Sequence, residues 1–151
     1  MKQFRVCDII FYDSQDNIIP NTAMIQVLHT ATTAVMRITN QKNGTCGSRI
    51  SHTTSGTTAC PVRALARRVH YIMNHPECTD EDIIGTYYFP TTRSTRPLQA
   101  GDMNKLIKSA VSLLGLDKKG FPPASVSSHS LRAGGAMAMH LNHIDRDKIR
   151  K

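Results

Sequence analysis

The spacing of apolar residues changes along the chain, and this change limits the folds that the sequence permits. Over residues 3 to 12 apolar side chains alternate with others and β-forming residue types dominate, which predicts a strand. After Pro61 the apolar residues recur at helical spacing: Val62, Leu65, Ala66, Val69, Ile72 and Met73. This pattern predicts an amphipathic helix with Pro61 at its first position. Strands followed by helices indicate the α+β class.

The remaining segments extend this pattern over a single domain of residues 1–151. MIQVLHT and AVMRITNQ predict two more strands, so we expect a small antiparallel β-sheet early in the chain. KNGTCGSRISHTTSGTTA predicts a long exposed loop, IIGTYYFP a short strand or extended connection, and TTRSTRP a basic loop. A helix is expected from Gln99 to Leu114, closed by Gly115, and DKKGFPPASV is expected to be a loop. Two further helices are expected, one capped by Ser127 or Ser128 and a short one near Asp145, so the sheet is followed by a mainly helical bundle.

The charge balance favours a polyanionic partner. The chain has 19 Lys and Arg against 11 Asp and Glu, a net charge of +8, and nucleic acid is the commonest partner of such a basic domain. A basic protein without such a partner remains the alternative. Since no apolar run approaches the roughly 20 residues that cross a bilayer, and MKQFRVCDII lacks signal-peptide features, we expect an intracellular protein with no membrane partner.

The sequence gives no support for metal or nucleotide chemistry. None of the four cysteines forms a Cys-x-x-Cys pair, and disulfides are not expected in a reducing compartment: Cys7, Cys46, Cys60 and Cys78. His140 and His143 have no evident third ligand, so a packing role is favoured for His140. No Gly-rich loop has the Gly-Lys-Ser/Thr ending of a phosphate loop. We therefore expect no metal and no cofactor.

The stretch SSHSLRAGGAMAMHLN carries the strongest chemical signal. His129 and Arg132 lie three residues apart and share one face of the expected helix. Free backbone N–H groups and the positive end of the helix dipole favour an anion there. Arginine binds two phosphate oxygens at once and histidine exchanges a proton near neutral pH, so the pair suits phosphoryl transfer on a nucleic-acid backbone. The alternative is that Arg132 pairs with a carboxylate while His129 caps or packs.

The wider stretch SSHSLRAGGAMAMHLNHID resembles the second conserved box of the tyrosine recombinases, the phage-integrase-like family. It is closest to the recombinases of eukaryotic mobile elements, and CPVRALARRV and LGLDKKGFPPASVSSHSLR resemble connecting segments of the same group. The resemblance implies an integrase-like catalytic core that recombines and integrates double-stranded DNA through a phosphotyrosine. It also implies other recombinase protomers as partners, no small-molecule substrate, and a nuclear location in a eukaryotic source.

The resemblance assigns roles to particular residues. His129 would be an acid/base group or phosphate ligand, and Arg132 would neutralise the non-bridging oxygens of the transition state. Lys42, after a strand and before a glycine, matches the hairpin lysine that donates a proton to the departing 5′-oxygen; a solvated turn lysine is the alternative. Arg93 and Arg96 resemble a loop that contacts the DNA backbone, with a solvated basic loop as the alternative.

Other parts of the family's machinery do not match. Arg5 lies in a strand pattern without the glutamate that follows the first-box arginine, so it is not accepted as that arginine. All four tyrosines precede His129, whereas the family's nucleophile follows it: Tyr12, Tyr71, Tyr87 and Tyr88. The chain thus resembles the middle of a catalytic domain, truncated at both ends, and we expect no DNA cleavage by it alone. A non-catalytic DNA-binding remnant is the alternative, and the matching flanks disfavour an unrelated basic protein.

Overall fold

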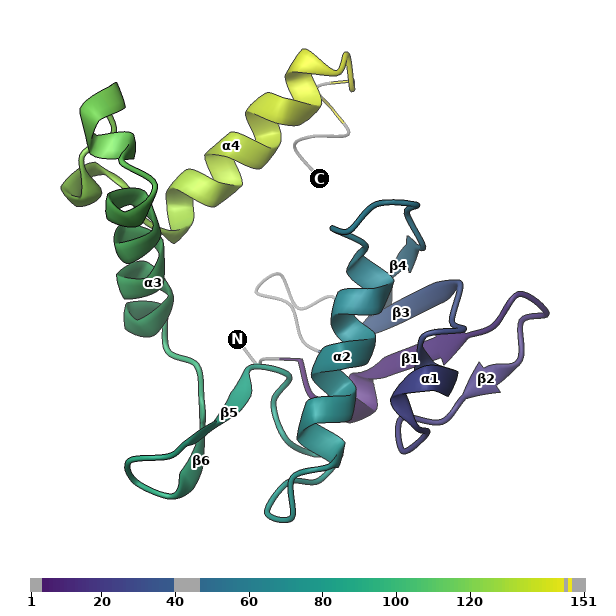
Figure 1. Cartoon of the computed structure of the whole chain (residues 1–151). Coiled ribbons are helices and arrows are strands. Elements are labelled where there is room, and N and C mark those ends of the chain that lie inside the picture. The colour runs from purple at the N-terminus through teal and green to yellow at the C-terminus, as the bar shows by residue number, and fades with distance from the viewer. Residues whose placement is uncertain (1–3, 40–46, 146, 148–151) are drawn as a thin grey trace. The chain divides into compact units, whose positions relative to one another are not determined.

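The computed structural model describes residues 4–39, 47–145 and 147, and the described part has the α+β class predicted from the sequence. It contains a small antiparallel sheet, a separate two-stranded hairpin and four α-helices, α1 to α4 (Figure 1). The chain divides into two compact units, residues 1–97 and residues 98–151. We call them unit 1 and unit 2 and describe each by itself.

The sheet of unit 1 has four antiparallel strands in the order β2-β1-β3-β4. Their bounds are Ile9–Tyr12 for β1, Ile18–Ile19 for β2, Thr33–Ile38 for β3 and Ser48–Thr53 for β4. In β1 the side chains of Ile9 and Phe11 are buried, while those of Ile10 and Tyr12 are half-buried. Because neighbouring side chains point to opposite faces of a strand, the sheet has a core face and an outer face.

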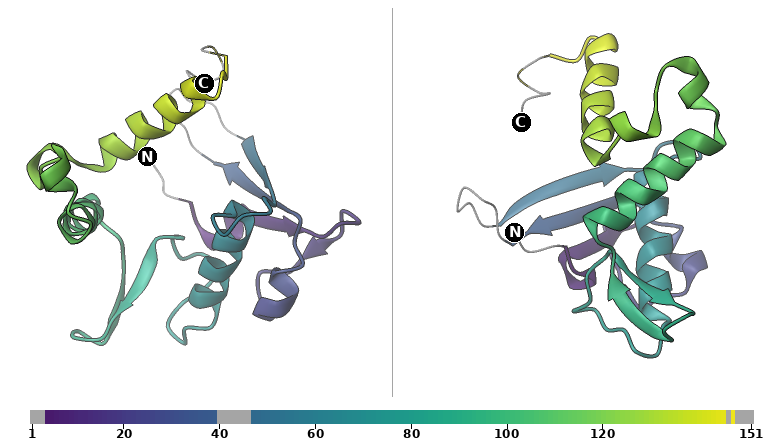
Figure 2. Two further views of the ribbon diagram at one scale, coloured as in Figure 1. Left: turned by 45° about the horizontal axis from the view of Figure 1, so that its top comes forward. Right: turned by 90° about the vertical axis from the view of Figure 1, so that its left-hand side faces the viewer.

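Helices α1 (Ile25–Leu28) and α2 (Pro61–Met73) belong to the core face. Helix α2 buries four apolar side chains at helical spacing, as the sequence predicted: Val62, Ala66, Val69 and Ile72. They join Phe11 and Ile9 of β1, Ala34 of β3 and Leu28 of α1 in one core cluster. Figure 2 shows α2 packed along one side of the strands.

A second β-structure in unit 1 is the hairpin of β5 (Thr86–Phe89) and β6 (Ser94–Pro97). The segment before it is joined to the start of the chain, since Val6 N–H donates to Asp82 O over 2.9 Å and Ile84 N–H donates to Phe4 O over 2.8 Å. The Tyr88 N–H also donates to the Tyr71 hydroxyl oxygen at 3.1 Å, which ties β5 to α2. The strand predicted within residues 83–90 is therefore confirmed.

Two predicted strands differ from the structure. The first strand begins only at Ile9, because Val6–Asp8 form a 3-10 turn in which the Asp8 carboxylate accepts a hydrogen bond from Arg5 N–H. MIQVLHT was predicted as a strand and forms the short helix α1 instead. Local bonds such as Leu28 N–H to Met24 O, 3.0 Å, satisfy its backbone, and Leu28 anchors it in the core. Tertiary packing thus overrides β propensity here.

Two predicted loops contain strands. Residues 48–53 lie in the segment expected to be a long exposed loop, yet they form β4, which pairs along all of β3. Strand β4 is an edge strand with mostly exposed side chains, so it lacks the apolar alternation that marks a strand in sequence. In the same way, the predicted basic loop at residues 91–97 supplies β6 of an exposed hairpin.

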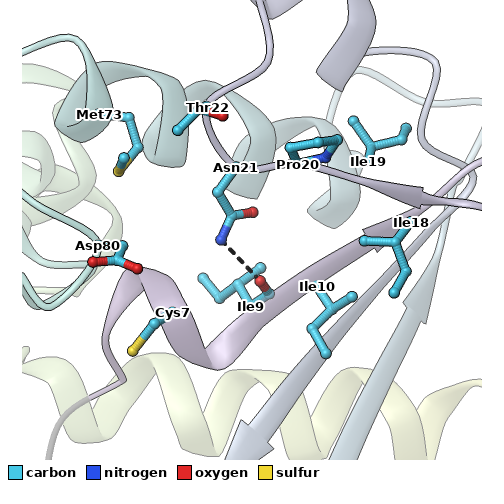
Figure 3. Close-up of a pocket in the computed structure, with 10 residues that line it drawn as sticks. All are labelled: Cys7, Ile9, Ile10, Ile18, Ile19, Pro20, Asn21, Thr22, Met73 and Asp80. Carbon is cyan, nitrogen blue, oxygen red and sulfur yellow. Dashed lines mark hydrogen bonds between the residues drawn. The ribbon is translucent and has the colours of Figure 1, made fainter.

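The edge of β1 is completed by a side chain. Strand β2 has only two residues and pairs with β1 only at Phe11 and Tyr12. Beyond that point the Asn21 amide Nδ2 donates to the carbonyl oxygens of Val6 and Ile9, both at 3.0 Å. Figure 3 shows the bond to Ile9. One amide group therefore binds the carbonyl of Ile9 at the start of β1 and that of Val6 in the preceding 3-10 turn.

Unit 2 consists of α3 (Ala100–Leu113), two short 3-10 turns (Leu116–Lys119 and Pro123–Ser125) and α4 (Ser128–Leu141). The helix predicted from Gln99 to Leu114 is confirmed, and Gly115 follows it with φ +60°, a left-handed conformation that suits glycine. Among the described residues of unit 2, Val111 is the only buried apolar side chain. The helix predicted near Asp145 lies largely outside the described residues.

Candidate nucleic-acid interface

Helix α4 begins with a filled set of backbone hydrogen bonds. Ser127 is the N-cap, and its Oγ accepts from His129 N–H at 3.3 Å, while Ser130 Oγ accepts from Ser127 N–H at 3.1 Å. Ser128 N–H donates to Asn104 Oδ1 of α3 at 2.8 Å, and Ser130 N–H donates to Ser127 O at 3.0 Å. The sequence predicted free N–H groups that would receive an anion here; the first three helical N–H groups already have protein acceptors.

Unlike the backbone N–H groups, the side chains of His129 and Arg132 at this helix start have no partner among the described residues. His129 and Arg132 are both exposed, and within the described residues neither side chain makes a hydrogen bond, an ion pair or a ring contact. The cap is supplied by Ser127, so His129 does not cap the helix through its side chain. Within the described residues, Arg132 thus has no carboxylate partner, and the cap of this helix comes from Ser127 and not from His129. Any anion chemistry at this turn depends on the imidazole, the guanidinium and the helix dipole.

The basic residues of the hairpin occupy two different environments. Arg93 lies in the turn between β5 and β6, exposed and with φ +48°. Arg96 is on β6 opposite Tyr87, and its guanidinium carbon lies 3.8 Å from the centroid of the Phe89 ring. Arg96 thus stacks on an aromatic side chain in a cation–π contact. Both residues belong to unit 1, whereas His129 and Arg132 belong to unit 2.

Lys42 lies outside the described residues. The strands on either side of it are described, however, and Ile38 of β3 pairs with Ser48 of β4. In the sequence, Lys42 falls between these two paired strands, and its predicted role stays a prediction.

Arg5 is bound to carboxylates. Its Nε lies 3.6 Å from the Asp8 carboxylate, and its Nη1 is hydrogen-bonded to Glu81. At the high pH where arginine titrates, the Cys7 thiolate and the Glu81 and Asp8 carboxylates raise the pKa of this guanidinium. Arg5 therefore has a structural role, and the sequence does not match it to the first-box arginine of the recombinases.

A hollow of about 400 Å³ lies at the β2 edge of unit 1, and Figure 3 shows the residues around it. Four of its ten lining residues are isoleucines, the others include Met73, Pro20, Cys7 and Asp80, and none is a lysine, arginine or histidine. Burial raises the pKa of the Cys7 thiol, so this sulfur is kept protonated. The hollow therefore offers nothing that would attract a phosphate.

Two features of the candidate interface could not be predicted from the sequence. Asn104 orders the start of α4 from α3, and no local pattern in the sequence marks that contact. Arg37 of β3 and Arg49 of β4 lie directly opposite each other. Because residues 42–59 were predicted to be a loop, the sequence did not predict this pairing. Within the described residues, no group of three or more His, Cys, Asp and Glu side chains is arranged to hold a metal ion, and no helix is long and apolar enough to span a membrane.

Comparison with known proteins adds no relative: no family model, no curated protein and no solved structure matches this chain.

Proposed function

We propose that this chain is the DNA-binding core of a tyrosine-recombinase-like protein, in which His129 and Arg132 contact a phosphate of double-stranded DNA. The observation that carries the proposal is the state of the helix start: both side chains are exposed and unpartnered among the described residues. The backbone around them is fixed by capping bonds from Ser127 and Asn104. A cation without a carboxylate partner on an ordered turn is suited to receive an external anion.

The chemistry of Arg132 and His129 suggests a different role for each of them at the phosphate. The Arg132 guanidinium can donate two parallel hydrogen bonds to non-bridging phosphate oxygens and offset their charge. The His129 imidazole can hydrogen-bond a third oxygen and exchange a proton with it. The net charge of +8 adds a long-range attraction that is sensitive to salt. Lys42 is proposed as the proton donor to the departing oxygen, on the strength of its place in the β3–β4 connection.

The tyrosines of the described chain have other contacts. The Tyr71 hydroxyl accepts a hydrogen bond from Tyr88 N–H, and the Tyr87 ring lies 4.2 Å from that of Phe89. The Tyr88 ring lies 5.0 Å from that of His75, and Tyr12 is half-buried in β1. A phosphotyrosine step needs a hydroxyl beside the phosphate, and none of these residues supports that role. We therefore propose binding, and no strand cleavage, for this chain alone.

The proposed contact between Arg132 and DNA is tested with Arg132→Ala. The control is Lys108→Ala on the exposed side of α3, which removes one positive charge from the same unit. Duplex affinity is measured by fluorescence anisotropy across a salt titration. Loss of one phosphate contact should lower the slope of log K against log salt by about 1 for Arg132→Ala and by less for Lys108→Ala. Equal slopes for both variants would contradict a phosphate contact at Arg132.

The catalytic alternative is tested with a nicked suicide duplex, which traps a covalent tyrosine intermediate. We expect no band that survives denaturation and no shift on protease treatment. A stable protein–DNA adduct would show that one of the four tyrosines is a nucleophile and that the chain acts as an enzyme by itself.

A further inference from the structure

The outer face of the unit 1 sheet carries two arginines directly opposite each other. Arg37 on β3 pairs in register with Arg49 on β4, so both side chains project from the same face. Directly opposite residues of an antiparallel pair have Cβ atoms about 4.5–5.5 Å apart, and like charges in that position are destabilising. Both arginines are exposed. The sheet therefore holds two positive charges close together where folding alone would favour their separation.

No carboxylate offsets this pair within the sheet. The register places Val35 and Ser51, and Thr33 and Thr53, on the same face as the two arginines, and Ile10, Tyr12 and Ile18 continue it across β1 and β2. None of these strand residues is acidic. The nearest acid by register is Asp8, just before β1; its side chain is buried and held by Arg5.

The two arginines are positioned differently. The Arg37 Nη2 donates to the Cys7 carbonyl oxygen at 2.9 Å, so this guanidinium is oriented by the backbone while its other donors stay exposed. Arg49 makes no hydrogen bond or ion pair with another described residue. Ser51, two positions along β4, presents an exposed hydroxyl beside Arg49. One fixed and one adjustable guanidinium with a neighbouring hydroxyl match the donors that proteins use on phosphate oxygens.

We propose that Arg37 and Arg49 form a clamp for one phosphodiester of the DNA backbone on the outer face of the sheet, a binding site separate from His129 and Arg132. This inference rests on the proposed function, because it takes duplex DNA as the ligand. A phosphate between the two guanidinium groups converts their mutual repulsion into attraction to a shared anion. The pair lies one position from the end of the β3–β4 ladder, next to the connection that contains Lys42.

Helix α2 supplies the matched comparison. Arg63 and Arg67 are exposed one turn apart on its outer side, in the same unit and with the same total charge as the sheet pair. They lie on a helix and have no cross-strand register, and neither guanidinium makes a hydrogen bond with a described residue. Non-specific attraction to DNA would treat the two pairs alike, whereas a clamp would not.

The experiment compares full-length wild type, Arg37→Gln/Arg49→Gln, Arg63→Gln/Arg67→Gln and Arg49→Gln in duplex binding across a salt titration, with thermal unfolding of each protein. The sheet double variant should lose about two units of salt slope and roughly 25-fold in affinity at 0.15 M salt, since each released counterion contributes a factor of about five there. The melting temperature of Arg49→Gln should stay the same or rise, because one of two like charges has been removed, whereas the double variant also loses the bond to Cys7 O. Arg49→Gln, which loses no described contact, should show about half of the binding effect.

Equal losses from the sheet and α2 double variants would overturn the clamp. If Arg132→Ala weakens binding while Arg49→Gln does not, the clamp is wrong and the proposed function stands. Absence of any salt-dependent duplex binding by the wild type would overturn the proposed function and the clamp with it.

Discussion

The two units of this protein differ in how they are stabilised. The described part of unit 1 buries twelve apolar side chains in one cluster, including Phe11, Leu28 and Ile72 at 0% exposure. In unit 2, among the described residues, Val111 alone is buried, while Leu113 is 86% exposed and Leu131 61% exposed. The hydrophobic contribution to folding thus lies largely in unit 1. The His129–Arg132 turn lies in the other unit, where hydrogen bonds and helix caps account for more of the order.

The two candidate sites are therefore held in place in different ways. Arg37 and Arg49 are carried by a sheet whose opposite face is the core, so their spacing is set by a packed structure. The His129–Arg132 spacing is set by helix geometry, and the position of that helix start depends on Ser127 and Asn104. A packed scaffold holds a site more rigidly than a capped helix with few buried contacts.

The largest expected effect tests the core of unit 1 directly. Phe11→Ala removes a ring that is 0% exposed and leaves a cavity, so it should lower the free energy of unfolding by about 3–5 kcal/mol. Leu113→Ala on unit 2 removes a side chain that is 86% exposed and should change it by less than about 0.5 kcal/mol. Urea denaturation followed by circular dichroism measures both. Similar losses would show that unit 2 has a core of its own.

An intermediate effect tests the caps of unit 2. Ser127→Ala removes the hydroxyl that accepts from His129 N–H, so it should reduce the stability of α4 by about 1 kcal/mol. Hydrogen exchange at the first amides of α4 measures this loss. Ser109→Ala, an exposed position within α3, is the control and should be neutral or slightly stabilising. If both variants exchange alike, the cap does not order this turn.

The smallest effect concerns a turn of unit 1. The Asp13 carboxylate accepts hydrogen bonds from the Asn17 side chain and from the N–H groups of Asn17 and Gln15, which lower its pKa in the folded state. A lowered folded pKa stabilises the protein above the unfolded value, near 4, and the benefit is lost as the pH falls through the folded pKa. Wild type should melt slightly above Asp13→Asn at pH 6, with the gap closing below pH 4. A gap that persists in acid would contradict this.

The sequence predicted the parts of the molecule whose signals are local. The 3.6-residue spacing after Pro61 and the glycine after Leu114 were sufficient for α2 and α3, because each helix carries its own pattern and its own stop signal. The same is true of the His129–Arg132 pair, whose shared face follows from helix geometry alone. The N-cap was narrowed to two serines, and the structure selects Ser127.

The remaining features depend on partners distant in the sequence. Strand β4 has a polar, exposed pattern and is a strand only because β3 lies beside it. Residues 25–28 have β-favouring types and fold as a helix because Leu28 fits the core. The Arg37–Arg49 pairing and the Asn104–Ser128 bond follow from register and from helix contact, respectively, and neither is visible before the fold is known.

The amide of Asn21 has a consequence for the behaviour of the protein at high concentration. An exposed strand edge with free carbonyls is a template on which another chain can add a strand and start aggregation. By donating to Ile9 O at the start of β1 and to Val6 O in the turn before it, Asn21 occupies two acceptors beyond the end of β2. A single side chain thus protects this edge against intermolecular β-pairing, a protection that a replacement by leucine, similar in size but without donors, would remove.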